Sequence, residues 1–255
     1  DLHKEYRRQR QMCIRDRDIL DKKEIKQKIT SDNQYKSWMK KIQSITDEFA
    51  MSSEFNSKVA LDHGIEHMDR VANNVYKLLK ECNFDEKTCN LGYIAGLIHD
   101  IGMVDGKTGH AQKGAEMAKI FLEELDLVDA CDIKVITDAI ENHGNGGNSI
   151  EPITLSLAIC DKADMCRKRS LGKLSPIQFI ESYTMDIHRN ILQINYVMDE
   201  LKGKEGLYII PKSIDIPKIL GTKLGMQVEF YINGKYEEFE DRIEYKGQIY
   251  QRKNN

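Results

Sequence analysis

The chain has 255 residues, of which 40% are hydrophobic and 31% charged, and its formal net charge is −3. This length allows one large domain, or one domain with a small appendage, around a sizeable buried core. The nearly balanced charge argues against a general nucleic-acid coat and against a protein held on a membrane surface by basic residues. The apolar runs are all shorter than the roughly 18 residues that a transmembrane helix needs.

The cysteines and the first residues of the chain indicate the compartment. Six cysteines are scattered through the sequence without a CxxC pair, which argues against a disulfide framework and against a cysteine-type zinc site. The first 30 residues are strongly charged and contain no apolar segment of the kind found in a secretory signal. We therefore expect a reducing, cytoplasmic setting.

Residues 1–30 are expected to form a charged N-terminal tail. Residues 7–17 (RRQRQMCIRDR) are basic and show no periodic pattern. The string MCIRDR also resembles translated sequencing-adapter read-through, so a native tail and an artefact are both open. Residues 1–17 therefore carry no functional interpretation.

Residues 31–184 are predicted to form one helical domain. Apolar residues recur there at helical spacing in five segments, 64–82, 86–99, 110–125, 127–142 and 151–168. A shorter helix is predicted after Pro176. Three glycines lie inside the helical segments, where each costs about 1 kcal/mol relative to alanine. Close helix packing is the usual compensation, and we expect it at Gly92, Gly96 and Gly114.

Residues 185–255 are predicted to form a small α+β appendage. Side chains alternate over 190–198 and 226–232 in the manner of strands. Asn233-Gly234 is a strong hairpin signal, and Lys246-Gly247 is a weaker one. Residues 213–225 are predicted to hold a short helix. The expected fold class is thus mainly α, a helical bundle followed by a small α+β appendage.

Histidine and aspartate gather at the ends of the predicted helices. His63 and His67 are four residues apart, so they share one helix face if their helix begins by Asp62. His99-Asp100 ends an apolar helix, and His110 and His143 lie at the ends of two others. Imidazole and carboxylate groups that converge from several helix ends are a ligand set for Zn, Fe, Mn or Ni.

Each of these residues also has an ordinary explanation. A single histidine at a helix end is more often a dipole or capping partner than a ligand, and we read His3 and His188 in that way. Asp161 interrupts an apolar helix, where a lone carboxylate is costly unless it is paired or metal-bound. The case for a metal site rests on the combination, which runs H-x3-H, HDIG, H, NH and D-K-x-D along the chain.

This order of motifs resembles the HD superfamily of metal-dependent phosphohydrolases, which is named for its His…His-Asp…Asp ligands. The matching stretches span residues 60–170 and read DHGIEHMDRVA, AGLIHDIG, GHAQKGAEMA, AIENHGNGG and LAICDKADMCRKR. The resemblance implies an HD-type helical bundle. The sequence looks in particular like a bacterial HDIG-type subgroup with a small C-terminal α+β extension.

The resemblance also implies which residues bind metal. His67 resembles the first ligand, His99 and Asp100 the central pair, and Asp161 the last ligand, with Asp100 placed to bridge two metals. Further ligands of the binuclear branch are matched by His63, His110 and His143. The implied cofactor is one or two divalent ions of Mn, Fe, Ni or Zn. Two metals, one metal with the extra histidines on substrate phosphate, and no functional metal all remain open.

Two branches of the superfamily fit poorly. Stringent-response hydrolases carry HD-x-x-ED, whereas His99-Asp100 is followed here by IGMV. In the cyclic-dinucleotide phosphodiesterases of the HD-GYP type a lysine follows HDIG, and this chain has Met103 there. It also has Asn142-His143 in place of their His-His pair and GGN in place of GYP. Specificity for cyclic di-GMP is therefore not supported.

The implied activity is hydrolysis of a phosphomonoester or phosphodiester by metal-activated water. The expected substrate is a nucleotide, a short oligonucleotide or another phosphorylated small molecule. Asp100 and Lys162 are expected to act in catalysis, and Asp164 is expected to accept a hydrogen bond from a ligand histidine or to pair with Arg167. The cations expected to meet substrate phosphate, unless they are merely solvated charges, are Arg70, Lys107, Arg167 and Arg169.

The alternative function is a non-catalytic nucleotide- or metal-sensing module that signals through its appendage. No membrane and no duplex nucleic acid is expected as a partner, and a homodimer is left open. The appendage is expected to be non-catalytic, and either to cover the helical domain or to mediate self-association. A two- or three-stranded sheet is marginal alone in water, so it must pack on something.

Overall fold

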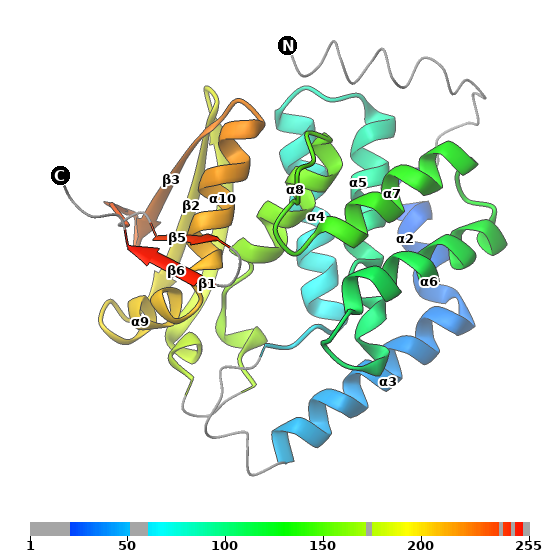
Figure 1. The fold of residues 1–255 in the computed structure, drawn as a ribbon, viewed down its shortest axis with the longest axis horizontal. Helices are drawn as coiled ribbons and strands as arrows, with labels where there is room; N and C mark the ends of the chain where they lie inside the picture. Colours follow the sequence, from blue (N-terminus) through cyan, green and yellow to red (C-terminus); the bar gives the residue numbers. More distant parts are fainter. Residues whose placement is uncertain (1–20, 52–60, 172–174, 240–241, 246–247, 252–255) are drawn as a thin grey trace.

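The computed structural model describes residues 21–51, 61–171, 175–239, 242–245 and 248–251. A bundle of helices and a smaller sheet with its own helices lie side by side (Figure 1). The mainly α fold class with a small α+β appendage is thereby confirmed. Within the described residues, no helix is long and apolar enough to cross a membrane.

Two helices precede the segments in which periodicity was clear, α2 (Lys22–Ser31) and α3 (Asn33–Met51). Asp21 begins α2 with a capping box, because its side chain accepts from the Glu24 amide while the Glu24 side chain accepts from the Asp21 amide. Ile25 and Ile29 are buried in the core. Sequence reasoning placed residues 22–30 in the charged tail, since these two apolar residues stand alone among lysines and glutamates.

The five predicted helices of the bundle are confirmed. They are α4 (Ile65–Glu81), α5 (Glu86–Ile98), α6 (His110–Leu125), α7 (Ala130–Asn142) and α8 (Pro152–Ala163). Helix α8 ends five residues before its expected limit, because the chain leaves helical geometry at Asp164 and turns back toward α4. Two short 3₁₀ turns complete the bundle, η2 (Ile101–Asp105) and η3 (Arg167–Arg169).

Glycines bring the helices that carry the histidines into close contact. A Cβ atom on Gly96 would lie 2.4 Å from the Cα atom of Ala72, so α4 and α5 touch through their backbones there. Gly92 lies similarly tight against the Leu79 side chain. A Cβ atom on Gly102 would lie 2.0 Å from the carbonyl oxygen of His110, which fixes η2 against the start of α6. The expected close packing is confirmed, and it sets the spacing of the histidine-bearing segments.

The appendage is built on a sheet of order β1-β2-β3-β4. Its strands are β1 (Ile180–His188), β2 (Ile191–Met198), β3 (Gln227–Ile232) and β4 (Lys235–Glu237). The outer pairs are antiparallel, and β2 and β3 are parallel. The connection between β2 and β3 contains α9 (Lys202–Ile209) and α10 (Lys212–Lys223). Asn233 and Gly234 both have positive φ, 51° and 79°, which confirms the predicted tight hairpin.

Three features of the appendage differ from the expectation. The helix predicted after Pro176 is a single 3₁₀ turn, η4 (Pro176–Phe179). Strand β1 follows it at once and was missed, because polar residues occupy most of its outward positions and few apolar ones mark the inner face. Helix α9 was not predicted. Strands β5 (Arg242–Tyr245) and β6 (Gln248–Gln251) pair antiparallel, but the turn predicted at Lys246-Gly247 lies outside the described residues.

The sheet packs against the helical bundle through specific polar contacts. The Tyr196 hydroxyl donates to the carbonyl oxygen of Ala163 at 3.1 Å, at the end of α8. The Asn74 amide of α4 donates to the Tyr183 hydroxyl at 2.8 Å. Lys77 donates to the carbonyl oxygen of Met185 at 2.7 Å. The appendage therefore supports the backs of α4 and α8, two helices that carry candidate ligands.

Replacement of Gly96 by alanine should destabilise the protein. Overpacking against the Ala72 backbone costs about 3 kcal/mol, and the better helix propensity of alanine returns about 1 kcal/mol. The expected net loss is about 2 kcal/mol in the free energy of unfolding, measured by urea denaturation. A suitable control is Gly144→Ala, because a Cβ atom there meets no described neighbour within 4 Å. An unchanged urea midpoint for Gly96→Ala would refute the backbone contact.

Candidate metal centre

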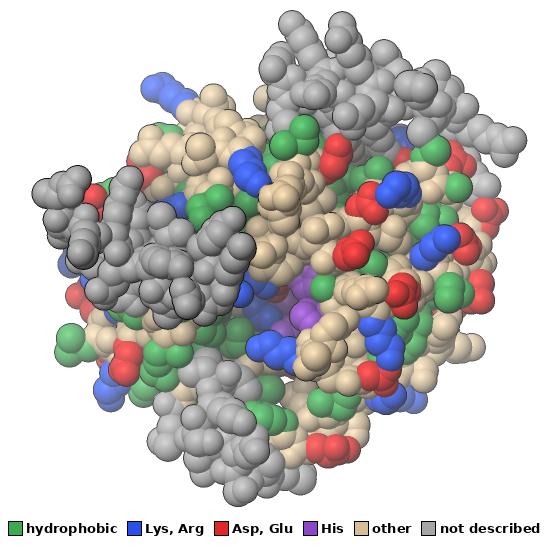
Figure 2. All heavy atoms as spheres, in the orientation of Figure 1, with side chains coloured by type: hydrophobic (Ala, Val, Ile, Leu, Met, Phe, Trp, Pro, Cys, Tyr) green, Lys and Arg blue, Asp and Glu red, His purple; other side chains and the backbone are tan. Residues whose placement is uncertain are grey.

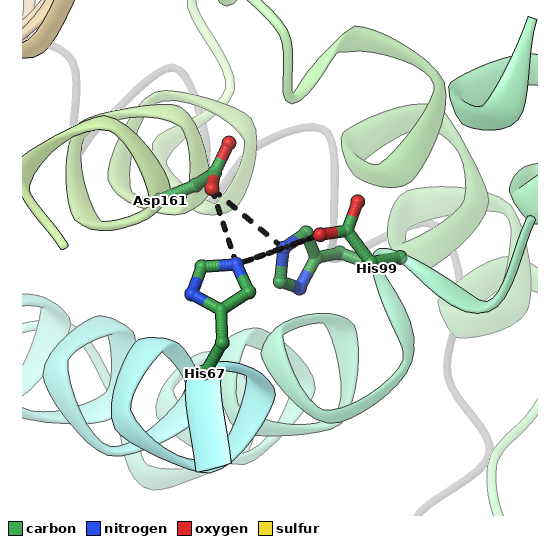
Figure 3. A group of neighbouring side chains, drawn as sticks. His67, His99 and Asp161 are labelled. Carbon is green, nitrogen blue, oxygen red and sulfur yellow. Dashed lines mark hydrogen bonds and ion pairs between the residues drawn. The ribbon is translucent and has the colours of Figure 1, made fainter. Parts of the chain in front are cut away.

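Two groups of ligand atoms share one aspartate at the centre of the helical bundle. The first group consists of His67, His99, Asp100 and Asp161, and the second of Asp100, His110 and His143. Within each group the ligand atoms lie within 4.8 Å of one another. Figure 3 shows His67, His99 and Asp161 pointing toward one another from three different segments.

The first group has the spacing of atoms around one ion. The Nε2 atom of His67 lies 3.2 Å from His99 Nε2, 3.3 Å from Asp161 Oδ1 and 3.4 Å from Asp100 Oδ2. Ligands bound to one ion at about 2.0–2.2 Å lie about 3.0–3.5 Å apart. The four side chains therefore fit a single divalent ion without rearrangement.

The second group uses the other oxygen of the shared aspartate. Asp100 Oδ1 lies 3.5 Å from Nε2 of both His110 and His143, and these two nitrogens are 3.2 Å apart. Asp100 Oδ2 faces the first group instead, 3.2 Å from His99 Nε2. One carboxylate thus presents a different oxygen to each set of histidines, which is the arrangement that a bridging ligand requires.

Backbone carbonyl groups orient three of the histidines. Nδ1 of His99 lies 2.9 Å from the carbonyl oxygen of Gly96, and Nδ1 of His143 lies 2.6 Å from that of Ile140. Nδ1 of His110 lies 2.8 Å from the carbonyl oxygen of Lys107. A carbonyl can only accept, so each Nδ1 carries the proton and each Nε2 offers a lone pair to the centre. The sequence places His99 and His143 directly after a last helical turn, and we did not consider that carbonyls of that turn can orient both rings.

An aspartate orients the remaining histidine. His67 Nδ1 lies 2.5 Å from Asp164 Oδ2, and Arg70 donates to both oxygens of Asp164 at 2.9 and 3.1 Å. The expected contact between Asp164 and a ligand histidine is therefore present, and its cation is Arg70 instead of Arg167. The carboxylate fixes the tautomer of His67, and Arg70 balances its charge.

The burial of Asp100 tests whether this site fits a metal. Its side chain is 1% exposed, and within the described residues neither of its oxygens accepts a hydrogen bond. Burial alone would raise the pKa of Asp100, but the surrounding histidines, His99 foremost, hold the pKa well below its usual range. A buried ionised carboxylate without hydrogen bonds is strongly unfavourable. A divalent cation between the two ligand groups is the compensation that these side chains fit.

Two further groups of the centre, His67 and Asp161, favour their charged forms despite burial. Burial and the charge of Arg169 act to lower the pKa of His67, yet its contacts with Asp100, Asp161 and Asp164 raise it to about 9. Burial opposes the ionisation of Asp161, but the ammonium group of Lys162 and the nearby histidines hold its pKa well below the usual range. The three carboxylates around His67 therefore favour a proton on this side chain when no metal is bound.

The cations predicted to meet phosphate are placed differently from one another. The Lys162 ammonium pairs with Asp161, beside the centre. Arg70 is held by Asp164, Arg167 lies 3.7 Å from Glu181, and the Lys107 side chain is exposed. Arg169 is 3% exposed and donates to backbone carbonyls, so it is not a solvated charge, and its contact with phosphate stays a prediction.

His63 does not belong to either ligand group. Helix α4 begins at Ile65, so His63 precedes it, and the condition for sharing a helix face with His67 is not met. The ring centroid of His63 nevertheless lies 6.0 Å from that of His67 and 6.5 Å from that of His110. Burial lowers the pKa of His63 to about 3. The histidine therefore stands beside both groups and is neutral near pH 7.

The centre is reached through a hollow in the surface. Figure 2 shows histidine side chains inside this hollow and Lys or Arg side chains close to them. His110 is 21% exposed, whereas His67 and His99 are fully buried. A ligand from solvent would therefore approach from the side of His110.

Comparison with known proteins agrees with this geometry. The HD domain family model matches residues 64–167, a range that contains both ligand groups. No curated protein matches the chain. The chain therefore carries an HD domain over residues 64–167, and its resemblance to the HD superfamily is confirmed.

Proposed function

We propose that this protein is a metal-dependent phosphohydrolase that cleaves a phosphomonoester or phosphodiester of a nucleotide or short oligonucleotide. The observation that carries the proposal is the buried Asp100 carboxylate, whose two oxygens face separate sets of histidines. Divalent ions at such a centre lower the pKa of bound water and supply hydroxide at neutral pH. Proteins with an HD domain are generally hydrolases, which agrees with a hydrolytic reaction.

The residues of this chain take distinct roles in the proposal. Asp100 holds the two halves of the centre in register, because each half uses one of its oxygens. Lys162 lies beside Asp161 and remains partly exposed, so its ammonium group is placed to neutralise charge on an incoming phosphate. Asp164 keeps His67 in the tautomer whose Nε2 lone pair faces the centre.

Two metals explain the described geometry better than one. With a single ion at the first group, His110 and His143 would still converge on the opposite oxygen of Asp100 without a partner for their lone pairs. A second ion at that position uses all three atoms. A set of nitrogen and oxygen ligands suits Mn, Fe, Ni or Zn, so the identity of the ions stays open.

A sensing role is supported by one contact between the appendage and the centre. The side chain of Leu220 on α10 packs so closely on Gly146 that a Cβ atom there would lie 2.7 Å from its Cδ1 atom. Gly146 belongs to the loop that directly follows His143. A movement of the loop after His143 would therefore be transmitted to α10. Turnover of a generic phosphoester distinguishes an enzyme from a sensor.

Replacement of Asp100 by alanine should remove metal binding and hydrolysis together. Both halves of the centre lose a ligand, so we expect activity on bis(p-nitrophenyl) phosphate to fall at least about 100-fold. Bound metal is measured by elemental analysis, and circular dichroism checks that the helices remain. Asp138→Ala is the control, because Asp138 is a surface aspartate paired with Lys134. Full activity of Asp100→Ala would exclude the proposed mechanism.

Replacement of His110 by alanine tests the second metal. The second group then keeps only Asp100 and His143, so bound metal should fall from about two ions per chain to about one. His188→Ala provides the matched control, since His188 is an exposed histidine on β1. One ion per chain in both the wild type and His110→Ala would show that the centre is mononuclear.

Metal affinity of the metal-free protein should rise with pH. Carboxylates raise the pKa of His67 to about 9, so below pH 9 a metal must displace a proton from this side chain. The sign is therefore positive, with affinity increasing by about tenfold per pH unit up to about pH 9. Titration calorimetry with Mn²⁺ at pH 6.5, 7.5 and 8.5 measures the slope. A flat profile would mean that His67 is already neutral in the metal-free protein.

A further inference from the structure

His63 lies at the centre without the geometry of a ligand. The two ligand groups are complete without it, and its ring lies 6.0 Å from that of His67 and 6.5 Å from that of His110. It is the residue directly before the HD domain match, which begins at Gly64. The ring of His63 is therefore close to a histidine of each group without belonging to either group.

The backbone around His63 is held in place from the far end of the domain. The Asp62 amide donates to the carbonyl oxygen of Arg169 at 2.7 Å, and Leu61 and Ser170 form an antiparallel β-bridge. The Asp62 side chain closes the turn by accepting from the Gly64 amide at 3.1 Å. These contacts fix the backbone on both sides of His63 before α4 begins.

The Arg169 side chain completes this attachment. Its Nε donates to the carbonyl oxygen of Asp62 at 3.0 Å, and its Nη1 donates to the carbonyl oxygens of Asp164 at 3.0 Å and Asp161 at 3.3 Å. One buried guanidinium group therefore joins the turn that carries His63 to the end of α8. The position of His63 is thereby set relative to the ligand Asp161.

Two of the cations expected to meet the substrate phosphate are held by other groups. Arg70 and Arg169 were expected to meet it, but Asp164 and backbone carbonyls hold them. A phosphoryl group carries several oxygens that accept hydrogen bonds, and an imidazole has at least one N–H to donate in either protonation state. Resting on the proposed function, we propose that His63 is a substrate-contact residue that donates a hydrogen bond to the phosphoryl group, and that it is not a metal ligand.

The experiment measures metal content and phosphate binding separately. Metal ions bound per chain are counted in wild type, His63→Ala, His63→Gln and the His188→Ala control. The affinity of each Mn²⁺-loaded protein for inorganic phosphate is then measured by titration calorimetry. His63→Ala should keep the full metal content and bind phosphate about tenfold more weakly, which is the loss of one charge-assisted hydrogen bond. His63→Gln should recover part of the affinity, because its amide retains a donor.

Two results would overturn the assignment of His63. Loss of a metal ion in both His63 variants would make it a ligand, and unchanged phosphate affinity at full metal content would remove it from the substrate site. Failure of the proposed function looks different, because the metal-loaded wild-type protein would then not hydrolyse bis(p-nitrophenyl) phosphate, whatever its affinity for metal and phosphate. If His63→Ala does not fold, as judged by circular dichroism, the comparison of His63→Gln with wild type decides the question.

Discussion

The centre of this protein depends on the burial of one carboxylate. Asp100 is enclosed by four histidines, and an ionised carboxylate in such surroundings costs several kcal/mol when it has no hydrogen bonds. The surrounding helices are packed so that imidazole nitrogens face it. An unpaired negative charge is therefore unfavourable at the centre, and binding of a cation there is favourable. Binding of metal and stability of the bundle are therefore coupled.

Helix ends are the means by which the chain concentrates these ligands. His99 and His143 follow the last turns of α5 and α7, while His110 begins α6. Carbonyls of the last helical turns orient the first two rings, so no additional side chains are needed to fix their tautomers. Gly96 then lets α4 approach α5 closely, and His67 reaches the same point from the first turn of α4. Backbone geometry, more than side-chain packing, sets the positions of the ligands.

The sequence predicted what depends on periodicity and spacing. The helices α4 to α8 have repeated apolar faces, which predicted them, and the order of His and Asp along these helices predicted the members of the two ligand groups. Strand β1 and helix α2 were not predicted, because their buried residues are few and lie among polar and charged residues. The burial of Arg169 was not predicted for another reason, since nothing in the basic run RKR distinguishes a buried guanidinium group from a solvated one. The position of His63 before α4 was not predictable either, because its neighbour Asp62 is held by Arg169, 107 residues further along the chain.

That long-range contact closes the domain on itself. The β-bridge between Leu61 and Ser170 brings the two ends of the ligand-bearing stretch side by side. The polypeptide thus enters and leaves this unit at one place, as it does in modules that tolerate fusion. Because α2 and α3 contribute to the core of the bundle and the sheet packs on α4 and α8, the segments before residue 61 and after residue 170 can vary during evolution only where those contacts are kept. The closure itself holds the two ends of the ligand-bearing stretch together while the chain outside it varies.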